Sequence, residues 1–324
     1  MKTIDQLDLS GRRVFIRVDF NVPLSNGRVT ENSRIANALP TIRHAIDAGA
    51  RVVLASHLGR PKGKVRPEFS LSPAAVELTE LLGRKVAMAP DCVGSITELT
   101  VDGMEDGDIV LLENLRFHPE EEKNDPAFAR QLAALADVYV NDAFGTAHRA
   151  HASTAGITEH IDEVAAGFLM KREVEMLSGL LRAPEHPFVA IVGGAKVSDK
   201  IQLLSNMLDK VDSILIGGAM AYTFLKAQGH AVGTSRVEED RLELAAELLE
   251  RAQAANTSIE LPEDHIAAAS FDEQADAVSV ETVAIPEGLM GLDIGTATRA
   301  RYACLLYTSP SPRDVEESRM PSSA

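Results

Sequence analysis

The chain has 324 residues, which is enough for two domains that each bury a hydrophobic core. Hydrophobic residues make up 45% of it and charged residues 25%, so neither a disordered nor a fibrous protein fits the whole chain. The 32 Lys and Arg residues against 48 Asp and Glu residues give a formal charge of -16, which argues against a general nucleic-acid binder and against a polybasic membrane-surface protein. An anionic ligand is compatible with this charge if the basic side chains cluster.

Targeting segments and the number of cysteines indicate the cellular compartment of the protein. The N-terminal residues lack the apolar segment of a secretory signal, and no apolar run approaches the length of a membrane-spanning helix. Cys92 and Cys304 are too few for a disulfide framework or a cysteine metal cluster, which fits a reducing compartment. We therefore expect a cytoplasmic protein with no membrane partner and no nucleic-acid partner.

Short apolar runs alternate with amphipathic stretches along the chain. The apolar runs predict strands at 14–18, 52–55, 109–112, 138–140, 188–192 and 214–216. The amphipathic stretches predict helices at 34–48, 72–82, 127–136, 198–211 and 241–255. Strands that are apolar on both faces and separated by helices predict an α/β fold with parallel sheets.

A domain boundary is predicted where a long helical pattern over 168–181 meets two prolines, Pro184 and Pro187. Few contacts cross between domains at such segments. We therefore predict an N-terminal domain over 1–167, a connecting helix and hinge over 168–187, and a second domain over 188–303.

Loops that carry polar and basic residues follow the ends of four predicted strands, where open α/β sheets bind their ligands. The residues are Asp19, Phe20 and Asn21 after the first strand, His57, Leu58, Gly59 and Arg60 after the second, Arg116 after the third and Arg149 after the fourth, with Arg34 opening the first helix. Because a guanidinium fork pairs with phosphate and carboxylate, this arginine cluster predicts a phosphorylated or carboxylated small ligand.

Interpretations without a ligand stay open for these residues. Taken singly, each arginine also fits a solvated loop residue or the partner of a carboxylate. The histidines His148, His151 and His160 have a spacing that matches no common metal-ligand pattern, and we interpret them as structural.

A different arrangement follows the predicted strand at 188–192, which runs into Gly193-Gly194-Ala195-Lys196-Val197-Ser198-Asp199-Lys200. We predict Ser198 as the N-cap of the next helix, so that Lys196 and Lys200 stand where the helix dipole disfavours cations. A phosphate held by backbone N–H groups and both ammonium groups would offset that cost. Neither a Walker motif nor a spaced G-x-G-x-x-G is present, and the glycine turn at 217–218 also fits a simple strand-to-helix turn.

Five segments in chain order carry a family resemblance. They are Arg17-Val18-Asp19-Phe20-Asn21-Val22-Pro23, Ser56-His57-Leu58-Gly59-Arg60-Pro61, Leu112-Glu113-Asn114-Leu115-Arg116-Phe117, Asp142-Ala143-Phe144-Gly145-Thr146-Ala147-His148-Arg149 and Gly193-Gly194-Ala195-Lys196-Val197-Ser198-Asp199-Lys200. With them the chain resembles phosphoglycerate kinase from its first residues to about Arg301.

The resemblance implies two doubly wound, Rossmann-like domains with parallel sheets that face a cleft and close about a hinge. It implies a monomer that reversibly transfers a phosphoryl group from 1,3-bisphosphoglycerate to ADP, giving 3-phosphoglycerate and ATP, with Mg²⁺ bound alongside the nucleotide. The implied phosphoglycerate-binding residues are Asp19, Phe20, Asn21, Arg34, His57, Leu58, Gly59, Arg60, Arg116 and Arg149. The implied nucleotide-binding residues are Lys200, Gly217, Gly218 and Gly291, and Lys196 and Arg34 are the implied catalytic residues.

The sequence changes character at Cys304. The DNA that would encode 304–314 and 318–324 resembles a sequencing adapter read in one frame, so we interpret 304–324 as an artefactual, unstructured tail; a Ser/Pro-rich disordered tail is the alternative. The Gly-Gly-Gly-Asp loop with which the family holds nucleotide phosphates and metal has no counterpart before this tail. We therefore expect no metal ligand in this chain and an incomplete second domain.

Three functional hypotheses follow. The first is a phosphoglycerate kinase in which residues 1–303 bind 3-phosphoglycerate weakly and show negligible turnover. The second is a non-catalytic phospho-ligand binding protein that keeps only the N-terminal arginine rim. The third, a nicotinamide-dependent oxidoreductase, is disfavoured because the dinucleotide fingerprint is absent.

Overall fold

The computed structural model describes residues 1–182, 184–272 and 274–307. The chain divides into two compact units between Leu177 and Ser178. This division lies inside α6 (Phe168–Arg182), within the segment predicted to connect two domains. Among the described residues, none of the helices combines the length and the apolar character that crossing a bilayer requires.

A six-stranded parallel sheet lies at the centre of the first unit, with the strand order β5-β6-β4-β1-β7-β8. Its strands are β1 (Arg13–Arg17), β4 (Arg51–Ala55), β5 (Ala87–Met88), β6 (Ile109–Leu111), β7 (Val138–Asn141) and β8 (Val164–Ala166). The chain places β4, β5 and β6 on one side of β1, and β7 and β8 on the other. The direction of winding therefore reverses beside β1, which is the position where such sheets bind ligands.

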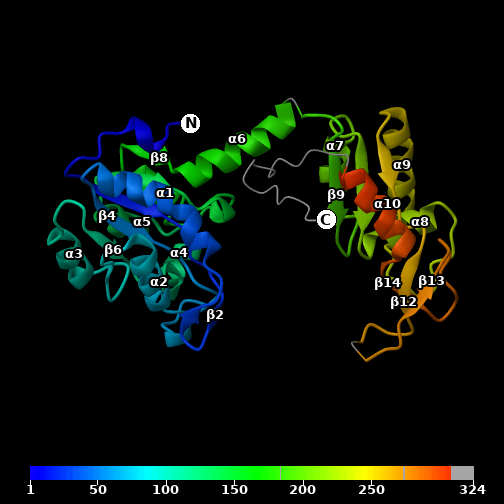
Figure 1. Cartoon of the computed structure of the whole chain (residues 1–324), viewed down its shortest axis with the longest axis horizontal. Helices are drawn as coiled ribbons and strands as arrows, with labels where there is room; N and C mark the ends of the chain where they lie inside the picture. The colour runs from blue at the N-terminus through cyan, green and yellow to red at the C-terminus, as the bar shows by residue number, and fades with distance from the viewer. Residues whose placement is uncertain (183, 273, 308–324) are drawn as a thin grey trace, which may run out of the picture. The chain divides into compact units, whose positions relative to one another are not determined.

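Helices cover both faces of this sheet (Figure 1). In β1, Val14 and Ile16 belong to one hydrophobic core and Phe15 to another, because successive side chains of a strand point to opposite faces. Helices α1 (Ser33–Asp47) and α2 (Ser72–Leu82) contribute to the first core, and α3 (Ser95–Asp102) and α5 (Pro126–Ala133) contribute to the second. The first unit is thus doubly wound, as predicted.

Two short elements complete this unit. The strands β2 (Leu24–Ser25) and β3 (Arg28–Val29) form a hairpin. Its turn residues Asn26 and Gly27 have φ angles of 51° and 71°, the left-handed conformation that a two-residue hairpin needs. A short helix, α4 (Pro119–Glu122), follows β6.

The second unit has a parallel sheet of three strands in the order β11-β10-β9. The strands are β9 (Val189–Gly193), β10 (Ser213–Gly217) and β11 (Ser258–Glu260), and the helices packed with them are α7 (Ile201–Met207), α8 (Met220–Ala227) and α9 (Leu242–Ala254). Their core includes Val192, Ile214 and Phe224. The parallel strands and the helices between them agree with the predicted α/β class.

An antiparallel sheet in the second unit was not predicted. It consists of β12 (His265–Ala268), β13 (Val278–Val280) and β14 (Met290–Ile294), with β12 in the centre. Helix α10 (Thr296–Tyr307) follows β14.

The structure differs from the sequence prediction at the start of the predicted tail. Residues 304–307 form the last turn of α10, whereas an unstructured tail was predicted from residue 304. Two leucines, Leu305 and Leu306, are good helix formers and extend a helix that is already nucleated. The remainder of the predicted tail, 308–324, lies outside the described residues.

Candidate functional site

The loops that follow β1 and β4 are joined by hydrogen bonds at the carboxyl edge of the six-stranded sheet. The backbone N–H of Phe20 donates to Ser56 Oγ (2.8 Å), and that of Gly59 donates to Asn21 Oδ1 (2.8 Å). Because β1 and β4 are neighbouring parallel strands, their ends bring these two loops together.

The loop after β6 joins the same edge. Asn114 Nδ2 donates to the carbonyl of Leu58 (2.8 Å), and Arg116 Nη1 donates to the carbonyl of Gly59 (2.9 Å). Gly59 has a φ of +61°, and a Cβ there would lie 2.4 Å from Phe69 Cε1. Glycine is therefore required at the point where two of the loops meet.

Three basic side chains are buried together beneath this edge. Arg17 is 1% exposed, His57 4% and Arg116 6%, and Arg17 Nη2 lies 3.2 Å from His57 Nδ1. Burial, with the positive charges of the surrounding arginines, lowers the pKa of His57 to about 2. Because arginine can only donate, His57 Nδ1 accepts, and the proton of the neutral ring is on Nε2.

Arg116 remains a buried cation with limited compensation. Burial lowers the pKa of Arg116, although Glu122 Oε1 lies 3.2 Å from its Nε. Even a lowered arginine pKa leaves the guanidinium charged at neutral pH. The site thus concentrates positive charge, which an anionic ligand would complement.

The buried carboxylate of Glu121 is linked to Arg17 through the hydroxyl of Ser153. Arg17 Nε donates to Ser153 Oγ (2.9 Å), which donates to Glu121 Oε1 (2.6 Å). The backbone N–H of Ser153 donates to Glu121 Oε2 (2.9 Å), and both Glu121 and Ser153 are fully buried. Arg17, Ser153 and Glu121 were not assigned to the site from the sequence. The feature that could have indicated them is Arg17, a single charged residue at the end of a buried apolar strand.

The remaining predicted residues of the rim are more exposed. Arg34 Nη1 donates to Asp19 Oδ2 (2.9 Å), and a Cβ on Gly145, in the loop after β7, would lie 3.1 Å from the same oxygen. Arg149 is exposed, and its Nε donates to His148 Nε2 (3.3 Å). Arg60 is exposed and forms no ion pair with any described residue. Side chains from four strand-end loops are therefore brought to one edge.

The predicted phosphate turn of the second unit follows β9. Lys196 is exposed, and Lys200 is half-buried and occupies the N-cap of α7. The prediction that Ser198 is the N-cap is wrong: its Oγ donates to Glu238 Oε1 (2.5 Å) and its N–H donates to Glu238 Oε2 (3.0 Å). The helix therefore begins later, because a distant carboxylate binds Ser198.

Glycines allow the turns after β9 and β10 to touch. Gly193 and Gly217 are paired in register, and the N–H of Met220 donates to the carbonyl of Gly194 (2.9 Å). A Cβ on Gly218, whose φ is +70°, would lie 2.9 Å from Gly194 O. Gly291 lies elsewhere, on β14 in the antiparallel sheet, where its N–H donates to Ser235 Oγ (2.9 Å). The structure thus groups Gly217 and Gly218 with the lysine turn and leaves Gly291 on a second element.

One unit has an arginine-rich edge on a parallel α/β fold, and the other has the turn at 193–200, called here the glycine-lysine turn. This combination is typical of proteins that bind phosphorylated small molecules. The phosphoglycerate kinase family model matches residues 4–310. The phosphoglycerate kinase of Anaeromyxobacter sp. (strain K) is 63% identical over 305 residues, covering 93% of this chain and 77% of the relative. The enzyme of that name from Moorella thermoacetica is 57% identical over 301 residues, which is 93% of this chain and 76% of the relative.

Solved structures agree. Phosphoglycerate kinase from Coxiella burnetii matches with a TM-score of 0.79 and 43% identity, over 95% of this chain and 77% of that one. The phosphoglycerate kinase of Pyrococcus horikoshii matches with a TM-score of 0.78 and 29% identity, over 95% of this chain and 79% of that one. The chain belongs to the phosphoglycerate kinase family and is a phosphotransferase of glycolysis.

Proposed function

We propose that the loops after β1, β4, β6 and β7 bind 3-phosphoglycerate, and that the glycine-lysine turn of the second unit binds the phosphates of ADP or ATP. The reaction is the reversible transfer of a phosphoryl group from 1,3-bisphosphoglycerate to ADP. The proposed phosphoglycerate-binding residues are Asp19, Phe20, Asn21, Arg34, His57, Leu58, Gly59, Arg60, Arg116 and Arg149. Lys200, Gly217, Gly218 and Gly291 are the proposed nucleotide-binding residues, and Lys196 and Arg34 the proposed catalytic ones.

One observation carries the substrate assignment: the buried cation Arg116 lies near neutral His57 in the loops that follow parallel strands, and the charge of Glu122 does not fully offset its burial. Burying cations is unfavourable unless a partner of opposite charge completes the site. The phosphate and carboxylate of 3-phosphoglycerate are such partners, and the exposed Arg60 and Arg149 add charge at the same edge.

The chemistry of the reaction suits these side chains. In the ATP-consuming direction the nucleophile is the carboxylate of 3-phosphoglycerate, which is ionised at neutral pH, so no general base is required. Catalysis then consists of positioning the reactants and neutralising charge on the transferred group. Asp19, held by Arg34, acts as an orienting group, and neutral His57 offers its Nε2–H to a substrate oxygen.

Members of the family generally use Mg²⁺ with ATP or ADP. The turn offers lysine ammonium groups and backbone N–H groups, which bind phosphate, and one exposed carboxylate, that of Asp199. Mg²⁺ requires oxygen ligands. Both carboxylate oxygens of Glu238 accept hydrogen bonds from Ser198. The turn therefore fits the nucleotide phosphates, and Asp199 is the one carboxylate within 193–200 that would contact a Mg²⁺ ion bound to them.

The substrate assignment is tested by titrating the chain with 3-phosphoglycerate in a calorimeter. Arg34→Ala is expected to weaken binding about tenfold or more, since hydrogen bonds to charged groups contribute roughly 1.5–3 kcal/mol. Arg43→Ala is the matched control, because Arg43 is also exposed on α1 but donates to the carbonyl of Leu81. Equal binding by both variants would exclude Arg34 from the site.

Enzyme activity separates this proposal from a protein that only binds phosphoglycerate. Lys196→Ala is expected to leave 3-phosphoglycerate binding unchanged, because Lys196 lies in the second unit, and to remove any residual ADP-dependent turnover of 1,3-bisphosphoglycerate that the parent chain shows. A coupled assay of ATP formation measures this. The expectations of negligible turnover by residues 1–303, of a monomer, of cytoplasmic location and of closure about 168–187 stay predictions.

A further inference from the structure

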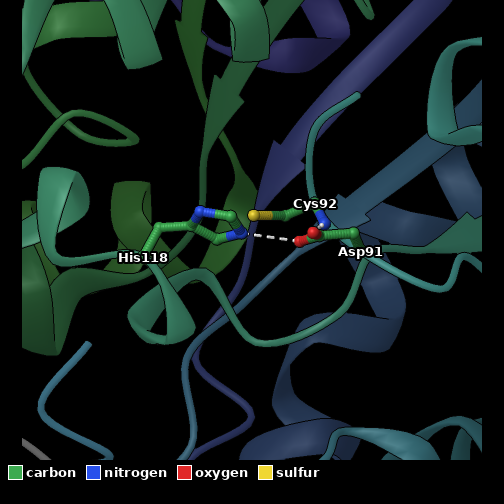
Figure 2. Close-up of side chains that lie close together, drawn as sticks. All are labelled: Asp91, Cys92 and His118. Carbon is green, nitrogen blue, oxygen red and sulfur yellow. Dashed lines mark hydrogen bonds and ion pairs between the residues drawn. The ribbon is translucent and has the colours of Figure 1, made fainter. Parts of the chain in front are cut away.

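Three potential metal ligands from different parts of the sequence meet in the first unit (Figure 2). Asp91 and Cys92 lie between β5 and α3, and His118 lies between a 3-10 turn (Leu115–Phe117) and α4. The strands β5 and β6 are parallel neighbours, so the segments that leave their carboxyl ends come together. This group, Asp91–Cys92–His118, uses none of the residues assigned above to phosphoglycerate or nucleotide.

The geometry of the group is close to that of a coordination site. His118 Nε2 lies 2.7 Å from Asp91 Oδ1, and one donor atom from each residue lies within 4.8 Å of the others. Figure 2 shows the Cys92 sulfur beside the imidazole, on the side where the Asp91 carboxylate also lies. A small convergence or separation of these atoms is enough to place them about 3.3 Å apart, as tetrahedral Zn²⁺ coordination requires.

The surroundings hold the donors in place. The ring of His118 stacks on Phe128, with centroids 5.2 Å apart and an interplanar angle of 28°. The N–H of Cys92 donates to Asp91 Oδ1 (2.7 Å), and Thr97 Oγ1 donates to the carbonyl of Asp91 (3.0 Å). Cys92 is fully buried, while Asp91 and His118 are half-buried, which leaves a route from solvent on one side.

We propose that Asp91, Cys92 and His118 form a binding site for a thiophilic divalent cation of the Zn²⁺ class. Imidazole nitrogen, thiolate sulfur and carboxylate oxygen are the ligand types that Zn²⁺ takes, whereas Mg²⁺ and Ca²⁺ take oxygen ligands. The three side chains leave a fourth position for water on the solvent side.

Binding requires that the Cys92 thiol lose its proton. The S–H bond breaks, the proton passes to solvent, and the sulfur donates an electron pair to the metal ion. Burial first, and then the charges of Asp91 and Glu121, raise the pKa of the Cys92 thiol when no cation is present. A bound cation reverses these effects, because its charge stabilises the thiolate and is itself balanced by Asp91.

The test uses the full chain, freed of metal by a chelator and titrated with Co²⁺ as a spectroscopic substitute for Zn²⁺. One ion per chain is expected, with a thiolate-to-cobalt charge-transfer absorption that Zn²⁺ abolishes by displacement. Cys92→Ser is expected to remove that absorption, and Asp91→Asn and His118→Asn to weaken Zn²⁺ binding at least tenfold in competition with a chromogenic chelator. Cys304→Ser and His160→Asn are the matched controls and should bind as the parent does.

Two outcomes would overturn the proposal. One is a charge-transfer absorption that persists in Cys92→Ser and disappears in Cys304→Ser. The other is Zn²⁺ binding that is unchanged in both Asp91→Asn and His118→Asn. If Cys92→Ser does not fold, these two variants decide, because their side chains are half-buried and circular dichroism can confirm their fold.

Discussion

A buried histidine that stays neutral distinguishes the cationic edge of the first unit. Burial disfavours protonation of His57, and Arg17, Arg116 and Arg149 add repulsion, so that its pKa falls to about 2. The ring accepts from Arg17 at Nδ1 and presents Nε2–H. His57 thus contributes a directed hydrogen-bond donor to a region where another cation would be strongly unfavourable.

The lowered pKa of His57 predicts a specific loss of stability in acid. In the unfolded chain a histidine binds its proton near pH 6.5, whereas the folded His57 does so only near pH 2. As pH falls below about 6.5, the unfolded state therefore gains protons first and the folded state loses relative stability. Between pH 7.5 and 5, His57 contributes a loss of about 2 kcal/mol.

Urea unfolding at these two pH values measures this loss. His57→Gln, which keeps an acceptor for Arg17, is expected to show a smaller pH dependence by about that amount, about 2 kcal/mol. His160→Gln, at an exposed position, should keep the parent dependence. An equal pH dependence in all three proteins would show that His57 titrates normally in the folded state.

Two glycines with similar backbone angles predict different effects of substitution. Gly59 and Gly27 have φ angles of +61° and +71°, but a Cβ would lie 2.4 Å from Phe69 in the first case and meets nothing within 4 Å in the second. Gly27→Ala should therefore lose only about 1–2 kcal/mol of unfolding free energy, from backbone strain. Gly59→Ala should lose more, and should weaken 3-phosphoglycerate binding, because Gly59 joins Asn21 and Arg116. Urea midpoints and calorimetry compare the two; equal losses would mean that Phe69 moves aside freely.

At the scale of elements, buried strands were the most predictable feature. The predictions at 52–55 and 188–192 correspond to β4 (Arg51–Ala55) and β9 (Val189–Gly193). Runs of β-branched and aliphatic residues between polar loops leave few alternatives for such segments. Their order along the chain also predicted the edge at which the basic side chains collect.

Elements that depend on distant partners were not predictable. In β13, Val278 and Ser279 are exposed, so this strand lacks the apolar run by which the parallel strands were recognised. The start of α7 was misplaced because Glu238, which binds Ser198, is forty positions away in the sequence. The group of Asp91, Cys92 and His118 was missed for the same reason, since only the pairing of β5 with β6 joins its members.

The Ser198–Glu238 contact predicts how firmly the glycine-lysine turn is held. Burial opposes ionisation of Glu238, but the hydrogen bonds from Ser198, together with the Val197 N–H and the charge of Lys196, outweigh it and lower the pKa of Glu238. Ser198→Ala should lower the unfolding free energy by about 1–3 kcal/mol and weaken nucleotide binding, because the carboxylate loses a donor. Ser205→Ala is the control, since Ser205 Oγ accepts a hydrogen bond from the exposed Arg251, which lies outside the turn. Equal stability and equal ADP binding in the two variants would show that the contact does not hold the turn.

At the scale of the whole molecule, the hydrophobic cores are separate. Each of the four core clusters formed by the described residues lies within a single unit: two in the first and two in the second. Each unit therefore has hydrophobic cores of its own. A ligand that binds one unit should stabilise that unit selectively.

This separation predicts that 3-phosphoglycerate protects only the first unit from unfolding. A ligand at a hundred times its Kd stabilises the folded state by about 2.7 kcal/mol, which moves a urea midpoint by about 1–2 M. Hydrogen exchange of the full chain in increasing urea, followed in peptides from β1 and β4 and from β9 and β10, measures each unit. The ligand should raise the urea midpoint of the peptides from β1 and β4 and leave that of the peptides from β9 and β10 unchanged. In Arg34→Ala the same ligand concentration should raise the first midpoint by less. A shift shared equally by both pairs would show that the two units unfold as one cooperative body.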